Sequence, residues 1–136
     1  MKFSRELSEG LYTIHAYRED EVIVNSPRRE EGVDEDGRLA LRQSFIISPQ
    51  RLLRDWPPAT IGQVEAEHLS ALSGLGLEVI LLGTGKQLRF PAAGQLAALV
   101  SLGIGYEVMD TPAACRTYNI LAGEGRQVGA AIIIEG

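Results

Sequence analysis

The segment that most constrains the fold runs from Leu77 to Leu82 and is apolar at every position except Glu78. It leads directly into the glycine turn Gly83-Thr84-Gly85. A short, continuous apolar run is typical of a strand that is covered on both faces, as in parallel sheets. In an open α/β sheet, the carboxyl end of such a strand faces the crevice where ligands usually bind. The segment therefore predicts an α/β fold and the place of a site, but it indicates no chemistry.

The residues that follow predict a β–α–β unit around this strand. Pro91 opens a helix that continues through Leu102 and stops at Gly103, because proline suits the first turn of a helix and glycine its end. Ile104 to Met109 is the next strand. A right-handed crossover then places the two strands parallel, with their carboxyl ends at the same edge.

Two further helices and a last strand are predicted on either side of this unit. Thr60 and Gln63 have the spacing of a capping box, which starts a helix that reaches about Ser73. Thr111 is expected to cap another helix, with Pro112 at its first position. That helix ends near Gly123, and the apolar segment Val128 to Ile134 forms the last strand.

The N-terminal part of the chain predicts antiparallel β-structure. Leu11 to Tyr17 and Val22 to Val24 form a hairpin, a charged loop follows to Arg38, and Leu39 to Ile47 contains a further strand or strand pair. We expect one α/β domain over 1–136, in which 1–38 is the hairpin and polar loop and 39–136 is the core. The predicted fold is a three-layer sandwich with a central mixed, largely parallel β-sheet, helices on both faces and an additional N-terminal antiparallel β-hairpin.

Composition and charge narrow the class of partner. The 136 residues are 45% hydrophobic and 23% charged, which is ordinary for a globular domain. The formal net charge of -5 disfavours unspecific binding to nucleic acid and to anionic membranes. One cysteine, Cys115, and a charged start of the chain without a signal-peptide pattern indicate a cytoplasmic protein. No apolar run is long enough for membrane insertion.

A crevice is expected between the Gly83–Gly85 turn and the helix that starts at Thr111. Free amides at that helix start could hold a phosphate or carboxylate, with Arg116 or Arg126 as counter-charge. Asp110 opposes this, because its negative charge lies where the anion would sit. The spacing also excludes the two common nucleotide-binding motifs. The dinucleotide motif needs a third glycine three residues after Gly85, where Leu88 stands, and the ATPase-type phosphate loop needs four residues between its glycines, where this turn has one.

No complete catalytic set is visible in the sequence. The histidines are His15 on the hairpin and His68 on the apolar face of a helix, and Cys115 lies on the buried face of another helix. A nucleophile, a base and an oxyanion site do not converge, and no metal-ligand spacing is present. We therefore expect no catalytic residues, no metal and no cofactor, and the sequence favours a protein that is not an enzyme.

Six motifs occur in order from about residue 39 to the end of the chain, with the hairpin also in keeping. They are Ser44–Pro49 with Trp56, Leu82–Gly85, Glu107–Thr111, Ala114, Thr117–Leu121, and Glu124–Arg126 followed by an apolar strand. Together they resemble a family of small uncharacterised proteins that includes a mitochondrial complex I assembly factor, an adipogenesis-associated protein and many bacterial proteins. The resemblance implies a single-domain three-layer α/β fold. Because no mitochondrial targeting segment is present, this chain resembles a bacterial member.

The resemblance also implies a shared surface near the crevice without assigning roles to its residues. Arg116, which is not part of the family pattern, joins that surface from its position on the helix. The candidate surface consists of Gly83, Thr84, Gly85, Asp110, Thr111, Arg116, Thr117, Asn119, Glu124 and Arg126. Two functions remain open: a non-enzymatic interaction or assembly-type module that holds a protein partner, and a small anionic metabolite-binding protein or weak enzyme that uses the crevice.

Overall fold

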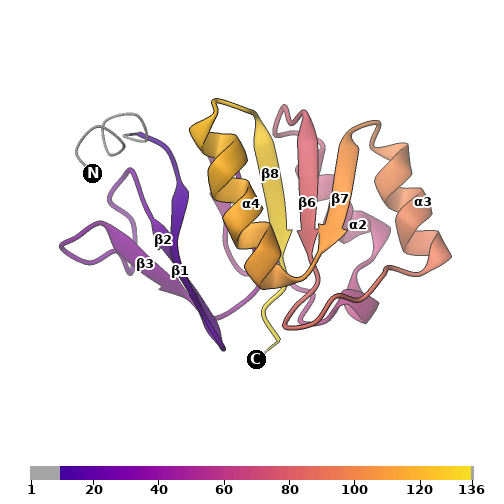
Figure 1. Cartoon of the computed structure of the whole chain (residues 1–136), viewed down its shortest axis with the longest axis horizontal. Helices are drawn as coiled ribbons and strands as arrows, with labels where there is room; N and C mark the ends of the chain where they lie inside the picture. The colour runs from indigo at the N-terminus through magenta and orange to yellow at the C-terminus, as the bar shows by residue number, and fades with distance from the viewer. Residues whose placement is uncertain (1–9, 136) are drawn as a thin grey trace.

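The computed structural model describes residues 10–135, which form two β-sheets and the helices that cover the larger one. The central sheet has five strands in the order β5-β4-β8-β6-β7 (Figure 1). The strand bounds are Leu52–Leu53 (β5), Phe45–Ile47 (β4), Val128–Ile132 (β8), Val79–Gly83 (β6) and Gly105–Met109 (β7). β6 is parallel to both β7 and β8, whereas β4 is antiparallel to β8 and to β5. The predicted mixed sheet and its parallel β6–β7 pair are confirmed.

The second sheet is antiparallel and contains β1 (Thr13–Arg18), β2 (Glu21–Asn25) and β3 (Arg38–Leu41). β1 and β2 form the predicted hairpin, with a register irregularity between Ile14 and Ala16. β3 pairs with β2, so Leu39 to Leu41 belong to this sheet and not to the central one. The N-terminal sheet therefore extends past residue 38 to Leu41, whose side chain lies in the same core cluster as Leu81.

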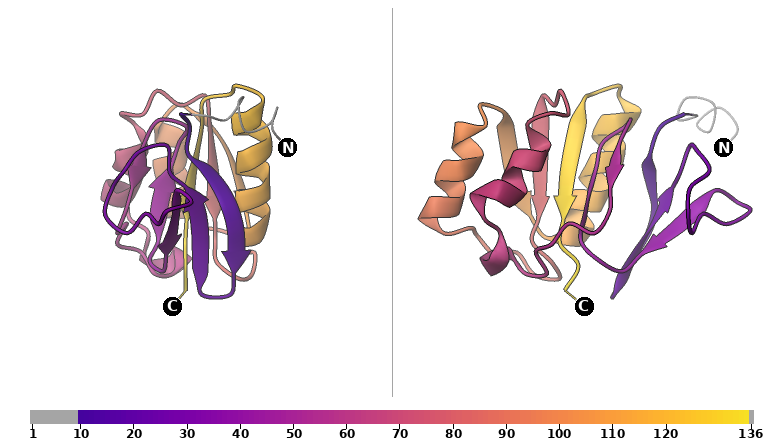
Figure 2. Two further views of the ribbon diagram at one scale, coloured as in Figure 1. Left: turned by 90° about the vertical axis from the view of Figure 1, so that its left-hand side faces the viewer. Right: turned by 180° about the vertical axis from the view of Figure 1, so that it is seen from behind.

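Side chains on the two faces of the central sheet belong to two separate cores. Leu81 and Ile132 pack in a cluster with α4 (Thr111–Gly123) and with the N-terminal sheet. Ile80 and Leu82 point the other way, toward α2 (Ala66–Leu69) and α3 (Ala93–Ser101). This alternation along β6 follows from the pleat of a strand. It gives the three layers that the apolar run predicts, with helices on both faces (Figure 2).

The expected helix over 60–73 is broken into three short pieces. They are the 3-10 turns η1 (Ile61–Gln63) and η2 (Ser70–Leu72), with α2 between them. The capping box predicted at Thr60 is wrong, because the Thr60 side chain makes no capping bond and Gln63 instead accepts from the amide of Ala59. The start of α2 is held by His68, whose Nδ1 accepts from the backbone N–H of Glu65 at 3.0 Å.

Trp56, which precedes Pro57 and Pro58, packs at the edge of this second core. Trp56 is 6% exposed, and its Nε1 donates to the carbonyl of His68 at 3.0 Å. The His68 ring also stands edge-on to the Trp56 ring, with 6.3 Å between centroids. His68 therefore fixes α2 against the connector and is partly buried by this packing.

Candidate functional site

The predicted juxtaposition of two strand ends is present. The Gly83–Gly85 turn follows β6, and Asp110-Thr111 follows β7, where Gly83 is in register with Met109. The N–H of Thr84 donates to the Met109 carbonyl at 2.9 Å, so strand pairing continues into the turn. Both segments lie at the edge where β8 also ends, because the three strands are parallel.

Thr111 ties these three strand ends together. Its hydroxyl donates to the carbonyl of Ile133 at 2.8 Å and accepts from the N–H of Gly85 at 2.9 Å. The N–H of Thr111 donates in turn to the carbonyl of Gly85 at 2.8 Å. The Thr111 side chain is 1% exposed, so these bonds lie inside the protein. We call the group formed by Gly83, Thr84, Gly85, Asp110, Thr111 and Ile133 the strand-end network.

Both glycines of the network are required by its geometry. A Cβ at Gly83 would lie 3.1 Å from both Thr111 Oγ1 and Ala114 Cβ, which is tighter than ordinary packing. Gly85 has φ +107, a conformation that side chains with a Cβ rarely adopt. The glycines thus permit close approach of the protein's own segments, which is a structural reason for the turn that needs no ligand.

The helix start at this edge is capped by the chain itself. Asp110 accepts at Oδ1 from the N–H of Ala113 at 2.8 Å and caps α4, so the expectation that Thr111 is the cap is wrong. Thr111 is already helical, and its hydroxyl is used by the strand ends. The N–H of Ala114 donates to the Asp110 carbonyl, and Pro112 has no N–H. The amides expected to hold an anion are therefore already hydrogen-bonded within the protein.

The strand-end network also holds a short exposed loop. Thr84 is fully buried, and its hydroxyl donates to the carbonyl of Gln87 at 2.7 Å and accepts from the N–H of Arg89 at 3.1 Å. Residues 86–90 are exposed between buried Gly85 and buried Pro91. We call this segment the 86–90 loop. Hydrogen bonds to the buried Thr84 hydroxyl fix the backbone of the loop, whereas its side chains face solvent.

The 86–90 loop exposes two large apolar side chains that the sequence reasoning missed. Leu88 is 49% exposed and Phe90 is 74% exposed. The only sequence signal is that Arg89 separates the two apolar residues in a short segment between Gly85 and Pro91, and this does not indicate exposure. The segment has no helical or strand periodicity, so the sequence pattern assigns no element to it.

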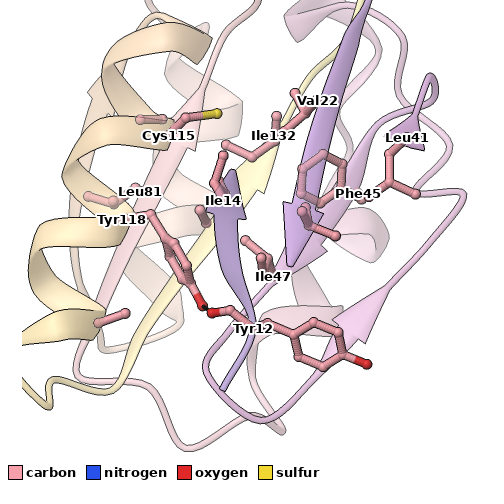
Figure 3. Close-up of a cluster of buried hydrophobic side chains, with 14 of the residues drawn as sticks. Tyr12, Ile14, Val22, Leu41, Phe45, Ile47, Leu81, Cys115, Tyr118 and Ile132 are labelled. Carbon is pink, nitrogen blue, oxygen red and sulfur yellow. Dashed lines mark hydrogen bonds between the residues drawn. The ribbon is translucent and has the colours of Figure 1, made fainter. Parts of the chain in front are cut away.

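Asn119 joins α4 to the N-terminal sheet and is not a free surface residue. Its Oδ1 accepts from the N–H of Ile14 at 2.8 Å, and its Nδ2 donates to the carbonyl of Ile14 at 2.7 Å. The adjacent Tyr118 donates from its hydroxyl to the carbonyl of Tyr12 at 2.8 Å. Figure 3 shows Tyr118 reaching from α4 toward Tyr12 through the cluster of buried side chains. Burial raises the pKa of Tyr118, in agreement with a hydroxyl that stays protonated and donates.

Glu124 and Arg126 lie at the opposite end of the sheet. They follow the C-terminal end of α4 and precede β8, whereas the strand-end network lies after β6 and β7. Arg126 Nε lies 2.9 Å from Glu78 Oε1, just before β6. The backbone N–H of Gln127 and the Arg126 side chain together lower the pKa of Glu78. Arg126 thus forms a charge pair about 20 Å from the strand-end network, since the thirteen residues of α4 separate the two ends.

The other α4 candidates lie between these two ends. Arg116 is exposed and Thr117 is half-buried. The structure therefore brings together Gly83, Thr84, Gly85, Asp110 and Thr111, uses Asn119 to hold β1, and separates Glu124 and Arg126 from the rest. The set expected from the sequence is not one continuous patch.

Within 10–135, no three His, Cys, Asp or Glu side chains gather in a way that could hold a metal ion. In the same range, no helix is long and apolar enough to cross a membrane. An open cavity of about 430 Å³ lies at the 26–37 loop, far along the chain from the strand-end network. Its Glu30 carboxylate already accepts from the hydroxyls of Tyr12 and Ser26.

Comparison with known sequences finds a matching family and several relatives. Residues 14–133 match the family described as "Protein of unknown function (DUF498/DUF598)". The chain is 34% identical over 114 residues to "NADH dehydrogenase [ubiquinone] 1 alpha subcomplex assembly factor 3" of Danio rerio, covering 82% of this chain and 63% of the relative. It is 44% identical over 90 residues to the protein of that name in Mus musculus, covering 65% and 48%. The chain therefore spans less than two thirds of these relatives.

Solved structures of bacterial proteins share the fold. A protein of Xanthomonas campestris superposes with a TM-score of 0.73 at 39% identity, covering 95% of this chain and 89% of the other. A protein of Bordetella parapertussis gives a TM-score of 0.74 at 32% identity, covering 92% and 97%. A Bordetella pertussis protein described as an Mth938-like domain gives 0.71 at 27% identity, covering 93% and 88%. The fold is that of the Mth938-like proteins, and the resemblance stated from the motifs is confirmed.

Proposed function

We propose a function from one premise: the chain belongs to the DUF498/DUF598 family. Relatives of this chain carry the name of a complex I assembly factor. We transfer only the class of activity, which is the holding of a protein partner while a larger assembly forms. In this proposal the chain is a non-enzymatic interaction module, and it acts through its surface.

The observation that carries this proposal is the exposed pair Leu88 and Phe90. Single apolar side chains are common on protein surfaces, but two large ones within three residues form a small exposed apolar patch. Covering a side chain of this size releases about 1.5–3 kcal/mol. Aromatic side chains are frequent among the few residues that dominate protein interfaces. Phe90 is therefore the residue we expect to contribute most to partner binding.

In this proposal the strand-end network has a structural role and the 86–90 loop has the binding role. Thr84 and Thr111 use their hydroxyls on backbone groups of the chain, and the glycines allow this close packing. In our proposal these residues hold the 86–90 loop in shape, and the loop makes the contact. Arg116 is exposed and stays a predicted contact at the margin of a partner surface. Glu124 is also exposed but lies at the opposite end of the sheet, so this proposal leaves it outside that surface.

A small anionic ligand in the crevice is not favoured by any observation. The amides at the start of α4 are occupied by Asp110 and Gly85, and Asp110 adds a negative charge there. We therefore propose no second function.

The proposal is tested by co-purification from cells that produce the protein naturally. The tagged chain is compared with a double variant, Leu88→Ser with Phe90→Ser. The matched control is Val100→Ser with Ile120→Ser, which changes two helix residues that are 60% and 61% exposed. We expect a protein to be recovered in fixed ratio with the wild type and the control, and to be lost from the loop variant. Equal recovery with all three chains, or no recovered protein even after chemical cross-linking, would contradict the proposal.

A further inference from the structure

We infer that the 86–90 loop binds a partner segment that combines an apolar surface with a carboxylate placed to meet Arg89. This inference rests on the proposed function and specifies the chemistry of the partner. It starts from the side chains that alternate along the loop. Leu88 and Phe90 supply the apolar contact, and Arg89 lies between them.

The charge of the loop differs from that of the chain as a whole. The chain has a formal net charge of -5, yet residues 86–90 contain Lys86 and Arg89 and no acidic residue. The Arg89 guanidinium contacts only a neutral group among the described residues, Gln87 Oε1 at 3.4 Å. An arginine that is exposed beside apolar side chains and not neutralised is well suited to pair with a carboxylate in two parallel hydrogen bonds.

Lys86 contributes less than Arg89 to this complementarity. Its Nζ lies 3.6 Å from Asp20 Oδ1, and the two side chains are 44% and 68% exposed. A surface pair of this kind stabilises little and exchanges partners readily. Arg89 is therefore the cation on which the inference depends.

The acidic groups around the loop favour a protein partner over an anionic membrane. The N–H of Lys86 donates to Glu135 Oε1 at 3.1 Å, so this carboxylate lies directly beneath the loop. Asp20 lies at its side. An anionic bilayer presents a continuous negative surface that would repel both groups, whereas a protein segment can place one carboxylate at Arg89 and none near Glu135. A symmetric contact between two copies is also disfavoured, because it would bring the cations of two loops together.

The fixed backbone of the loop lowers the cost of such binding. Thr84 holds the carbonyl of Gln87 and the N–H of Arg89, one on each side of Leu88. Less conformational entropy is lost when a segment is already held in its bound shape. Leu88, Arg89 and Phe90 can therefore act as one recognition element.

The experiment is photo-cross-linking in cells with p-benzoylphenylalanine in place of Phe90. Val100 and Ile120 receive the same replacement as controls on α3 and α4. Cross-linked peptides are identified by mass spectrometry, in the otherwise wild-type chain and in chains that also carry Arg89→Glu, Arg89→Lys or Arg29→Glu. Thermal unfolding of each variant checks that the fold is unchanged.

We expect position 90 to cross-link to a protein segment with apolar residues and at least one Asp or Glu. Arg89→Glu should lower the yield by roughly tenfold, the effect of a single charge pair. Arg89→Lys should lower it by a smaller factor, because lysine keeps the charge but not the two parallel hydrogen bonds. Arg29→Glu, at an exposed arginine outside the candidate surface, should retain most of the yield. An adduct with lipid, with a second copy of this chain, or with a segment lacking Asp and Glu would overturn the inference. So would a yield that Arg89→Glu leaves unchanged.

The control positions separate this inference from the proposed function. A protein adduct at 100 or 120 without one at 90 would overturn the inference and leave the interaction module standing. Absence of protein adducts at all three positions would overturn both.

Discussion

At the scale of single residues, Thr111 is a buried polar side chain with a structural role. Its hydroxyl satisfies the buried N–H of Gly85 and the buried carbonyl of Ile133. Valine has nearly the same shape but cannot make either bond, and each buried group left unsatisfied costs about 1–3 kcal/mol. We predict that Thr111→Val lowers the free energy of unfolding by about 2–4 kcal/mol in urea denaturation.

Thr117→Val is the matched control for that substitution. Thr117 lies on the same helix and is half-buried, without the two strand-end bonds of Thr111. We expect its effect to stay within about 0.5 kcal/mol. Equal losses for the two variants would contradict the assigned role of the strand-end network.

Cys115 gives a second prediction at the residue scale. Burial raises the pKa of its thiol to about 12, although nearby Arg116 lowers it slightly. The reactive thiolate is therefore scarce near neutral pH. We predict that a thiol reagent labels the native protein at pH 8 at least about a thousandfold more slowly than the urea-unfolded chain. Fast labelling of the folded protein would show that α4 opens readily or that the thiol is not buried.

At the scale of elements, the N-terminal sheet depends on α4. Asn119 makes two hydrogen bonds to Ile14 in β1, and Tyr118 bonds to Tyr12 beside it. We predict that Asn119→Leu lowers the free energy of unfolding by about 1–3 kcal/mol and speeds amide exchange in β1 and β2 more than in β6. Arg116→Ala on the exposed side of α4 is the control. An equal increase in amide exchange over both sheets would contradict the view that Asn119 holds β1 locally.

The polar loop after β2 gives a pH dependence. Burial alone would raise the pKa of Glu30, but hydrogen bonds from Tyr12 and Ser26 and the charges of Arg54 and Arg28 outweigh it and hold this pKa below the ordinary 4.5. A carboxyl with a lowered pKa in the folded state stabilises the protein above its unfolded pKa, and this is lost as pH falls through the folded value. We predict that the stability difference between wild type and Glu30→Gln is constant from about pH 6 to 8 and shrinks below about pH 4.5. A difference that grows on acidification would contradict this sign.

The elements that the sequence predicted well are those with one dominant signal. β6 has an apolar run that ends in glycine, and α3 ends at Ser101, two residues before Gly103, which has φ +72. The prediction of one continuous helix over 60–73 was wrong because the signals in this segment conflict. Its apolar positions have helical spacing, but packing of Trp56 against His68 and capping at Glu65 select short turns, and both depend on contacts that spacing does not contain. The strand Leu39 to Leu41 has the same limit: that it pairs with β2 depends on contacts between distant parts of the chain, which the local sequence does not contain.

At the scale of the whole molecule, the sequence predicted which strand ends meet but not what they do there. Gly83–Gly85 and Asp110-Thr111 are adjacent because parallel strands share an edge. Whether their amides face a ligand or each other depends on ångström-scale hydrogen bonding, which a pattern of glycines does not determine. Arg126 belongs to the same family pattern as Gly83–Gly85 but lies at the opposite end of the sheet, beside Glu78. Residues of one family pattern therefore need not form one site. The 86–90 loop was missed because exposure is a property of the folded chain.

The exposed apolar pair also predicts a stability effect for the whole molecule. Leu88 and Phe90 contribute little to the cores, so Leu88→Ser with Phe90→Ser should change the free energy of unfolding by less than about 1 kcal/mol. Urea denaturation of the double variant checks this. A loss of several kcal/mol would mean that the pair serves the fold, and any loss of partner binding would then have a structural cause.

Hydrogen–deuterium exchange of the chain, alone and in complex with its recovered partner, shows which residues the partner covers. We predict that partner binding slows exchange chiefly in residues 86–90 and in the adjacent start of α3, and leaves the Glu124–Arg126 end of the sheet unchanged. Unaltered exchange in 86–90 together with new protection at the Glu124–Arg126 end would contradict the claim that this loop is the contact surface.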